Sequence, residues 1–182
     1  RHYTTGALLS RIKEALATIG VDPERASAAD LEPVDEFHIG GAAATRELVG
    51  TLAITSQMAV LDIGSGIGGP ARLVAEATGA HVTGIDLTPE FVETAEALSE
   101  MVGLSAATTF ETGSALDMPF QDASFDVALL LHVGMNIPDK RRLMAEVFRV
   151  LKPGGLFAVY DVMKTSGEPI EFAVPWADEP EN

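Results

Sequence analysis

The sequence contains no cysteine among its 182 residues, which excludes disulfide bonds, zinc–thiolate sites and a cysteine nucleophile. The lack of cysteine also fits a reducing compartment, so we expect a cytoplasmic protein. No apolar run approaches the roughly 20 residues that a membrane-spanning helix needs, and no signal peptide is visible. Metal-ligand patterns such as H-E-x-x-H are absent as well, so we expect no metal site.

Basic residues are scarce. Lys and Arg together number 12 against 27 Asp and Glu, which gives a formal net charge of −15. Such a surface repels phosphate backbones and anionic lipids, so we expect neither nucleic acid nor a membrane as a partner. The one basic cluster, residues 140–142, falls in the first turn of a predicted helix and is interpreted as a solvated face. A homodimer is among the oligomeric states that the sequence leaves open.

The chain has the length of one domain, and 47% of its residues are hydrophobic, enough for a sizeable core. We divide it into a helical cap (1–55), a core (56–163) and an acidic, proline-containing tail (164–182). Helices are predicted in the cap over 4–19 and 42–54, with a structured connector over 21–41 between them.

The core alternates between strands and helices. Strands are predicted over 58–63, 81–85, 108–111, 125–131 and 156–162, and helices over 70–78, 89–103 and 139–151. Thr88 is the predicted cap of the middle helix, and Lys152–Gly155 is interpreted as a helix stop and turn. Repeated βα units predict an α/β, Rossmann-like, doubly wound and mainly parallel sheet with helices on both faces.

A glycine-rich turn follows the first predicted strand. Gly64, Gly66 and Gly69 satisfy the G-x-G-x-x-G pattern, which on its own is also typical of dinucleotide sites. Asp62, inside the strand, distinguishes the two, because its carboxylate would oppose a dinucleotide pyrophosphate. It suits a ligand that has an ammonium group and no phosphate, such as S-adenosylmethionine (AdoMet). Asp86, after the second strand, lies where a carboxylate accepts hydrogen bonds from ribose hydroxyls.

With these residues in place, the chain resembles class I AdoMet-dependent methyltransferases, in particular the small-molecule branch that includes sarcosine/dimethylglycine and ubiquinone/menaquinone-type enzymes. The resemblance rests on the segments 60–69, 84–86, 113–120, 124–127 and 149–155, and on 34–41 before the core. That family's fold adds two strands after the fifth, one of them antiparallel. We see no source for either before Asn182, and we expect this chain to lack them.

The resemblance implies a cofactor site and a reaction. The cofactor would be AdoMet, with S-adenosylhomocysteine as product, and no metal would be needed for methyl transfer to N, O or activated C of a small-molecule acceptor. Ser114 stands where the family often has Asp, so the neighbouring backbone is the stronger expected contact. The implied cofactor-binding residues are Asp62, Gly64, Ser65, Gly66, Gly68, Asp86, Leu87, Ser114, Ala115, Leu116 and His132.

His132 ends the fourth predicted strand, at the edge of a parallel sheet where ligands bind. It is our candidate for a base or substrate-orienting group, although a packing histidine is an open alternative. The cap covers the substrate in similar enzymes, so Tyr3 and His38 are expected to line the acceptor site. Met135 and Asn136, close after His132, are expected to do the same.

Three alternatives stay open at this point. An AdoMet-binding protein without activity is motivated by Ser114 and by the expected lack of two strands. A nicotinamide-dependent oxidoreductase is motivated by the glycine pattern, although Asp62 counts against it. An aminopropyltransferase shares the fold, but no acidic polyamine-binding motif is visible.

Overall fold

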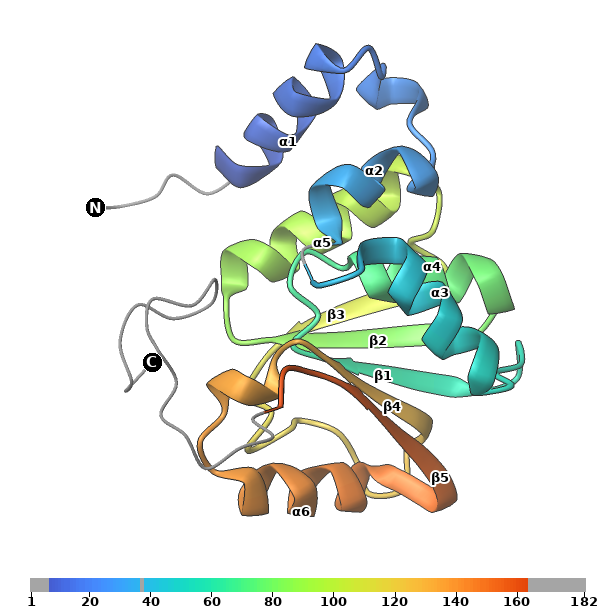
Figure 1. The fold of residues 1–182 in the computed structure, drawn as a ribbon, viewed down its shortest axis with the longest axis vertical. Helices are drawn as coiled ribbons and strands as arrows, with labels where there is room; N and C mark the ends of the chain where they lie inside the picture. The colour runs from blue at the N-terminus through green and yellow to red at the C-terminus, as the bar shows by residue number, and fades with distance from the viewer. Residues whose placement is uncertain (1–6, 37, 164–182) are drawn as a thin grey trace.

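Figure 1 shows the computed structural model, in which residues 7–36 and 38–163 are described. Its centre is a parallel sheet with the strand order β3-β2-β1-β4-β5. The strands are β1 (Ala59–Ile63), β2 (His81–Asp86), β3 (Thr108–Thr112), β4 (Phe125–Leu131) and β5 (Leu151–Tyr160). The chain begins the sheet at β1, moves outward to β3 and then returns to β4. The carboxyl ends of β1 and β4 therefore flank the switch point, where open α/β sheets bind ligands.

Helices cover both faces of the sheet because successive strand residues point to opposite sides. Val60 packs with α3 (Gly41–Thr51), α4 (Gly69–Thr78) and α5 (Pro89–Met101), whereas its neighbour Leu61 packs with α6 (Lys140–Val150). In Figure 1, α6 accordingly lies on the opposite side of the sheet from α3, α4 and α5. The predicted doubly wound α/β fold is confirmed.

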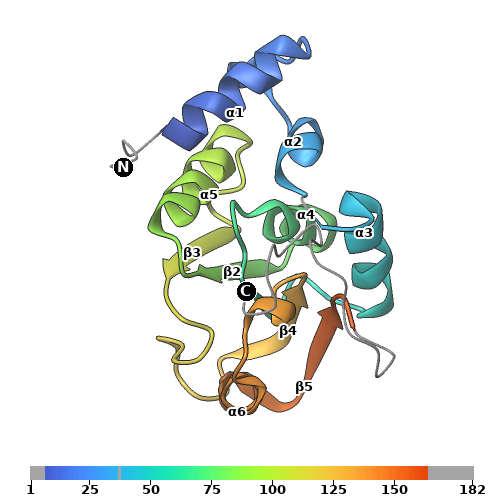
Figure 2. The same cartoon turned by 60° about the vertical axis from the view of Figure 1, so that its left-hand side comes forward.

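The N-terminal helices pack on the α4–α5 side of the sheet. They are α1 (Ala7–Thr18), a short 3₁₀ turn η1 (Pro23–Arg25), α2 (Ala28–Asp35) and α3. Figure 2 shows α1 beside α5, and α2 is also in contact with α4. Ile12 and Leu16 of α1 share a buried cluster with Leu31 of α2 and Leu98 of α5. The cap is thus docked on the core by apolar burial, and its boundary at residue 55 stays a proposal.

Helix α2 lies inside the segment that we expected to be a connector. Ser27 precedes it, and the Asp30 carboxylate accepts hydrogen bonds from the Ser27 N–H and hydroxyl at 2.9 and 2.6 Å. This arrangement is a capping box with Asp in place of the usual Glu or Gln. The sequence pattern missed the helix because it is short and contains Pro33.

The Lys152–Gly155 segment also differs from its prediction. Helix α6 does end at Val150, but β5 begins at Leu151, so the segment lies within the strand rather than in a turn before it. The pairing of β5 with β4 changes register between Phe125 and Val127, which accommodates this segment. Lys152 gains a partner there, because its ammonium donates to the Asp126 carboxylate at 2.7 Å.

The predicted tail and the question of two further strands concern residues 164–182, which lie outside the described residues. In residues 7–36 and 38–163, no helix is long and apolar enough to cross a membrane.

Candidate functional site

The glycine turn connects β1 to α4 with left-handed backbone angles at three positions. Gly64, Gly66 and Gly68 have φ of +74°, +53° and +83°, which side-chain-bearing residues rarely adopt. A Cβ on Gly64 would lie 2.4 Å from a methyl carbon of Val133, and one on Gly68 would lie 2.7 Å from the Phe110 ring. A Cβ on Gly66 would meet no atom within 4 Å. The turn therefore packs tightly at its two ends and is open in the middle.

Two cavities meet at this turn, sharing Gly64 and Val133 in their walls. One, of about 400 Å³, lies between the turn and the cap, and we call it the cap cavity. The other, of about 330 Å³, lies between the ends of β1 and β2 and the loop 113–118, and we call it the loop cavity. Both volumes are typical of small-molecule sites.

Most of the residues predicted from the sequence border one of these cavities. The cap cavity has Gly64, Ser65, Gly66, His38, His132 and Met135 in its walls. The loop cavity has Asp86, Leu87, Ser114, Ala115, Leu116 and Asn136. Asn136 thus lies on the loop side, away from His132. Gly68 and Asp62 border neither cavity. Gly68 has no room for a side chain because Phe110 and Arg72 lie against it, and Asp62 is buried in β1 just before the turn. Tyr3 lies outside the described residues.

Asp62 is buried with an unsatisfied carboxylate oxygen. Its exposed fraction is 1%, and Oδ2 has no hydrogen-bond partner among the described residues. Burial, followed by the nearby charges of Glu36 and Asp86, raises the pKa of Asp62 to about 7, while His38 opposes the shift. A buried ionised carboxylate is stable only when it is paired, so this position fits a cationic group of a ligand.

The Asp86 carboxylate connects the glycine turn to the residue that precedes α5. Its Oδ2 accepts a hydrogen bond from the Gly66 N–H and its Oδ1 one from the Thr88 N–H, both at 2.9 Å. We expected Thr88 to cap α5, but its hydroxyl makes no capping bond, and the Thr88 N–H is satisfied by Asp86 instead. Each carboxylate oxygen has a second lone pair, so Asp86 can still accept hydrogen bonds from hydroxyls in the loop cavity.

The loop 113–118 is organised by its own polar groups. The Ser114 hydroxyl accepts a hydrogen bond from the Leu116 N–H at 3.1 Å, and Ser114 forms an isolated bridge with Asp117. Sequence analysis expected the Leu116 backbone to contact a ligand, but its N–H is used within the loop. Ala115 and the side chain of Leu116 still border the cavity.

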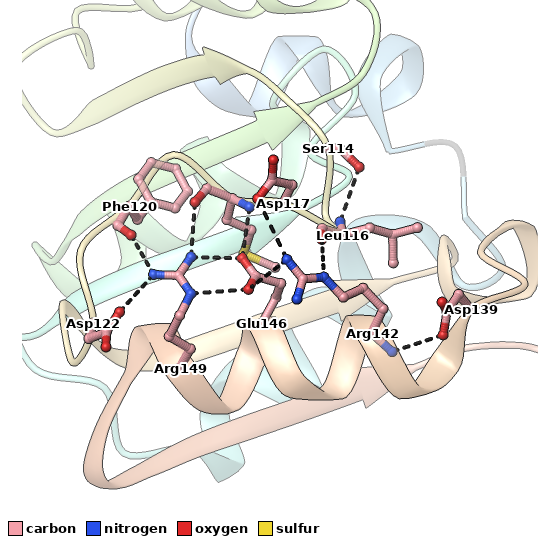
Figure 3. A network of polar contacts seen from close by, with 10 residues as sticks. Ser114, Leu116, Asp117, Phe120, Asp122, Asp139, Arg142, Glu146 and Arg149 are labelled. Atoms are coloured by element: carbon pink, nitrogen blue, oxygen red, sulfur yellow. Dashed lines mark hydrogen bonds and ion pairs between the residues drawn. The ribbon is translucent and has the colours of Figure 1, made fainter.

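Charged residues of α6 anchor this loop from the other side (Figure 3). Glu146, only 4% exposed, accepts a hydrogen bond from the Met118 N–H at 2.9 Å and one from Arg149 at 2.7 Å. Arg149 also donates to the Phe120 and Met118 carbonyls, and Arg142 donates to the Leu116 carbonyl at 2.7 Å. Hydrogen bonding from Arg149 is the largest of the effects that lower the pKa of Glu146 to about 2. The network fixes the outer wall of the loop cavity.

We expect Glu146→Gln to lower the free energy of unfolding by about 1–3 kcal/mol, because charge-assisted bonds to Arg149 are lost. The folded pKa is depressed, so the wild-type contribution is complete above about pH 4.5 and is lost as the pH falls toward 2. Urea unfolding at pH 3 and pH 7 measures this. A deficit of the variant that is as large at pH 3 as at pH 7 would contradict the assignment, and Glu47→Gln, an exposed α3 residue, is the control.

His38 is held on both ring nitrogens. Nε2 lies 2.7 Å from the Glu36 carboxylate and 2.9 Å from the Thr45 hydroxyl, and Nδ1 lies 3.2 Å from the Ile39 carbonyl. Each ring nitrogen thus faces a hydrogen-bond acceptor, the Glu36 carboxylate at Nε2 and the Ile39 carbonyl at Nδ1, so both nitrogens can donate when the ring is protonated. The hydrogen bond to Glu36 accordingly raises the pKa of His38. A ring held in this way is poorly suited to accept a proton from a substrate.

His132 differs in this respect. It has a left-handed φ of +57°, and its backbone N–H donates to the Tyr160 backbone carbonyl at 2.7 Å. Neither nitrogen of its ring has a hydrogen-bond partner among the described residues. Its ring, that of His38 and that of Tyr160 form a trio with centroids 5.9–6.1 Å apart. Ala53 and Ala123 also have a left-handed φ, but His132 is the one of these three residues that borders either cavity, and strained backbone is concentrated at functional sites. Sequence analysis missed Tyr160, although it ends β5 at the same sheet edge.

A buried ion pair, also missed by the sequence analysis, joins the cap to the turn. The Arg72 guanidinium, 1% exposed, donates to the Asp35 carboxylate at 2.7 Å and to the Ile67 carbonyl at 2.8 Å. It also donates to the Ala95 carbonyl and the Ser99 hydroxyl at 3.2 and 3.3 Å. Arg72 thus connects α2, the glycine turn and α5 at the cap side of the site.

Fold and site together define a Rossmann-like small-molecule-binding domain with an acidic strand residue before its glycine turn. The family model described as "Methyltransferase domain" matches residues 61–159, more than half of the chain. The chain therefore belongs to the methyltransferase domain family, and the resemblance seen in the sequence is confirmed.

Individual relatives agree. A sterol 24-C-methyltransferase of Gibberella zeae is 41% identical over 65% of this chain and 31% of its own length. The sterol methyltransferase-like protein 2 of Botryococcus braunii is 44% identical over 58% of this chain and 27% of its own length. The chain thus spans about a third of the curated relatives that it matches.

Solved structures extend the comparison. A candidate sarcosine dimethylglycine methyltransferase from Galdieria sulphuraria is 30% identical with a TM-score of 0.59, over 65% of this chain and 44% of that one. The [4+2]-cyclase SpnF is 27% identical with a TM-score of 0.63, over 85% of this chain and 56% of that one. One neighbour is thus named for a reaction other than methyl transfer.

Proposed function

We propose that this chain binds AdoMet across the two cavities and transfers its methyl group to a small molecule in the cap cavity. The observation that carries the proposal is Asp62, whose buried Oδ2 has no hydrogen-bond partner among the described residues and fits a cationic group of a ligand. The ligand's amine supplies that cation. Membership of the methyltransferase domain family and the sterol methyltransferase relatives support the same function.

The cavities fit the two halves of this cofactor. The loop cavity, with Asp86 for ribose hydroxyls and Leu87, Ala115 and Leu116 as apolar contacts, would hold the adenosine. The turn at Gly64–Gly66 and Asp62 would hold the methionine portion, with the start of α4 toward its carboxylate. The two cavities share Gly64 and Val133 in their walls, so the sulfur would lie where the cavities meet, facing the cap cavity.

When bound, AdoMet supplies an electrophilic methyl group: an electron pair of the acceptor forms the new bond to carbon, and the pair of the broken C–S bond stays on sulfur. The chain has to align the acceptor and exclude water, because the displacement itself is strongly driven. The acceptor gains one positive charge and must lose a proton. In this proposal His132, whose ring nitrogens have no hydrogen-bond partner among the described residues, would accept that proton from the wall of the cap cavity, whereas His38 is held by Glu36.

Labelled AdoMet tests the reaction. We expect transfer of the labelled methyl group to a member of a panel of small metabolites, with S-adenosylhomocysteine formed in equal amount. Binding of S-adenosylhomocysteine without transfer to any panel member would favour the alternative of a protein that binds the cofactor but does not transfer methyl groups. Binding of NADH instead would favour the nicotinamide alternative.

We expect His132→Asn to lower the turnover number by about 100-fold, because proton transfer to a placed base contributes on that scale. Asn tolerates the left-handed φ of +57°, so the turn keeps its shape. The dissociation constant of S-adenosylhomocysteine should stay unchanged within a factor of about 2. Steady-state kinetics and calorimetry measure the two quantities. A fall in cofactor affinity with unchanged turnover would show that His132 serves in binding instead.

A cytoplasmic location, the oligomeric state and the contacts of Tyr3 stay predictions from the sequence.

A further inference from the structure

The cap cavity has walls that are mainly apolar. Its apolar side chains come from the cap, the glycine turn, α5 and β4, and they include Leu8, Ile12, Val34, Ile67, Phe91 and Leu131. In the proposed function, the methionine portion of the cofactor occupies the side next to Gly64–Gly66. The acceptor then fills the space between that turn and the cap, where most side chains are apolar and the polar ones are Asp35, His38, Ser65 and His132. Burial of apolar surface is therefore the main force available to bind it.

Among the described residues, the walls of the cap cavity offer no free cation for an anionic acceptor. None of the described residues in its walls is Lys or Arg. The buried Arg72 behind it is held by Asp35, and the His38 ring is held by Glu36 and Ile39. The amide groups at the start of α4 can receive an anion, but the proposed function assigns them to the cofactor's own carboxylate. A carboxylate or phosphate of the acceptor would be buried without a partner, which is costly.

Cationic acceptors are disfavoured by the same reasoning. The Asp35 carboxylate in the cavity wall is paired with Arg72, and Asp62 serves the cofactor's amine in the proposed function. Two polar side chains in the walls have atoms without a hydrogen-bond partner among the described residues, Ser65 and His132. The Ser65 hydroxyl is buried beside Gly84, which leaves the His132 ring for the acceptor. One hydrogen-bonding or proton-releasing group of the acceptor is therefore satisfied there, and the rest of the acceptor meets apolar side chains.

We infer that the methyl acceptor is a neutral, mainly hydrocarbon molecule whose single reactive group lies against His132, rather than a zwitterionic or anionic metabolite. This inference rests on the proposed function and narrows it. It separates two classes that the comparisons leave side by side, sterol-type acceptors and amino-acid-type acceptors such as sarcosine.

A matched pair of probes tests the inference directly. Geraniol and geranic acid have the same carbon skeleton, but at pH 8 the acid is a carboxylate. With protein already saturated with S-adenosylhomocysteine, we expect calorimetry to show geraniol binding at least roughly tenfold more tightly than geranic acid, and no binding of sarcosine. Equal or tighter binding of geranic acid, binding of sarcosine, or no binding of geraniol to the saturated protein overturns the inference. Failure to bind S-adenosylhomocysteine in the first step would instead count against the proposed function.

A charged substitution in the wall of the cap cavity provides a second test of the inference. Val34→Lys adds an ammonium at the cap side of the cavity, and Val34→Met adds length without charge. We expect the Lys variant to reverse the preference, so that geranic acid binds more tightly than geraniol, and the Met variant to keep the wild-type order. Unchanged affinity for S-adenosylhomocysteine confirms that both variants are folded. A Lys variant that binds S-adenosylhomocysteine normally and keeps the wild-type preference overturns the assignment of this cavity to the acceptor.

Discussion

Replacing Asp62 with Asn is expected to weaken S-adenosylhomocysteine binding by roughly 100-fold, or about 3 kcal/mol, because a buried charged partner of the ligand's ammonium is removed. The two side chains have nearly the same shape, so the glycine turn should be preserved. Isothermal titration calorimetry at pH 8 measures the difference. Glu111→Gln, an exposed residue on β3, is the control, and its affinity should equal that of the wild type.

The same substitution should have the opposite effect on the unliganded protein. The pKa of Asp62 is raised from its ordinary value to about 7 in the folded state, so folding takes up a proton between about pH 4 and pH 7. Ionisation of Asp62 therefore lowers the free energy of unfolding as the pH rises through that window, and the decrease is nearly complete above pH 7. Asp62→Asn should unfold at a higher temperature than the wild type at pH 8, and this gain should disappear near pH 4.

Cofactor affinity should follow the same ionisation. The wild-type affinity for S-adenosylhomocysteine should be highest near pH 8, fall by about a factor of 2 at pH 7 and fall steeply below pH 7, because the carboxyl group must lose its proton to pair with the ammonium. The Asn variant should show no such fall. An Asn variant that binds as tightly as the wild type at pH 8 would remove the main support for the proposed cofactor site.

Replacing Arg72 with Met is expected to lower the free energy of unfolding by about 3–5 kcal/mol, because it leaves the Asp35 carboxylate buried without its partner. The bonds from Arg72 to Ile67 and α5 are lost at the same time, so the cap should separate from the turn more easily. Urea unfolding measures the stability, and hydrogen exchange of the α2 amides measures the cap.

The double variant Arg72→Met with Asp35→Leu is the matched control, since it removes both charges. It should recover most of the lost stability, because an apolar pair of similar volume replaces the buried ion pair. A loss below about 1 kcal/mol for Arg72→Met alone would contradict a structural role of the pair. A double variant that is less stable than the single one would show that Asp35 has another partner.

Local sequence patterns were sufficient to predict the sheet and the residues at its edge. Strands β1 and β4 are short, mainly apolar runs that precede a glycine turn or a polar residue, and parallel order follows from the alternation with helices. Asp62, Asp86 and His132 could be found because strand ends meet at one edge. Helix α2 was missed because Pro33 and its short length hide the helical period.

Contacts between distant segments could not be predicted in this way. Burial raises the pKa of Asp62 to about 7, and the nearby charge of Glu36 in the cap adds to the shift. Nothing in the strand sequence itself indicates the contribution of Glu36. The Asp35–Arg72 pair joins two helices, and the His38–His132–Tyr160 trio joins three separate elements. The different roles that we propose for His38 and His132 likewise depend on hydrogen-bond partners that only the fold brings together.

Calorimetric titration of the protein with S-adenosylhomocysteine and, separately, with NADH tests the central claim most directly. The structure predicts saturable 1:1 binding of S-adenosylhomocysteine that is weakened in Asp62→Asn, and no binding of NADH, whose pyrophosphate would be opposed by Asp62. Folded protein that takes up NADH, or that gives no binding heat with S-adenosylhomocysteine, would contradict the assignment of this site.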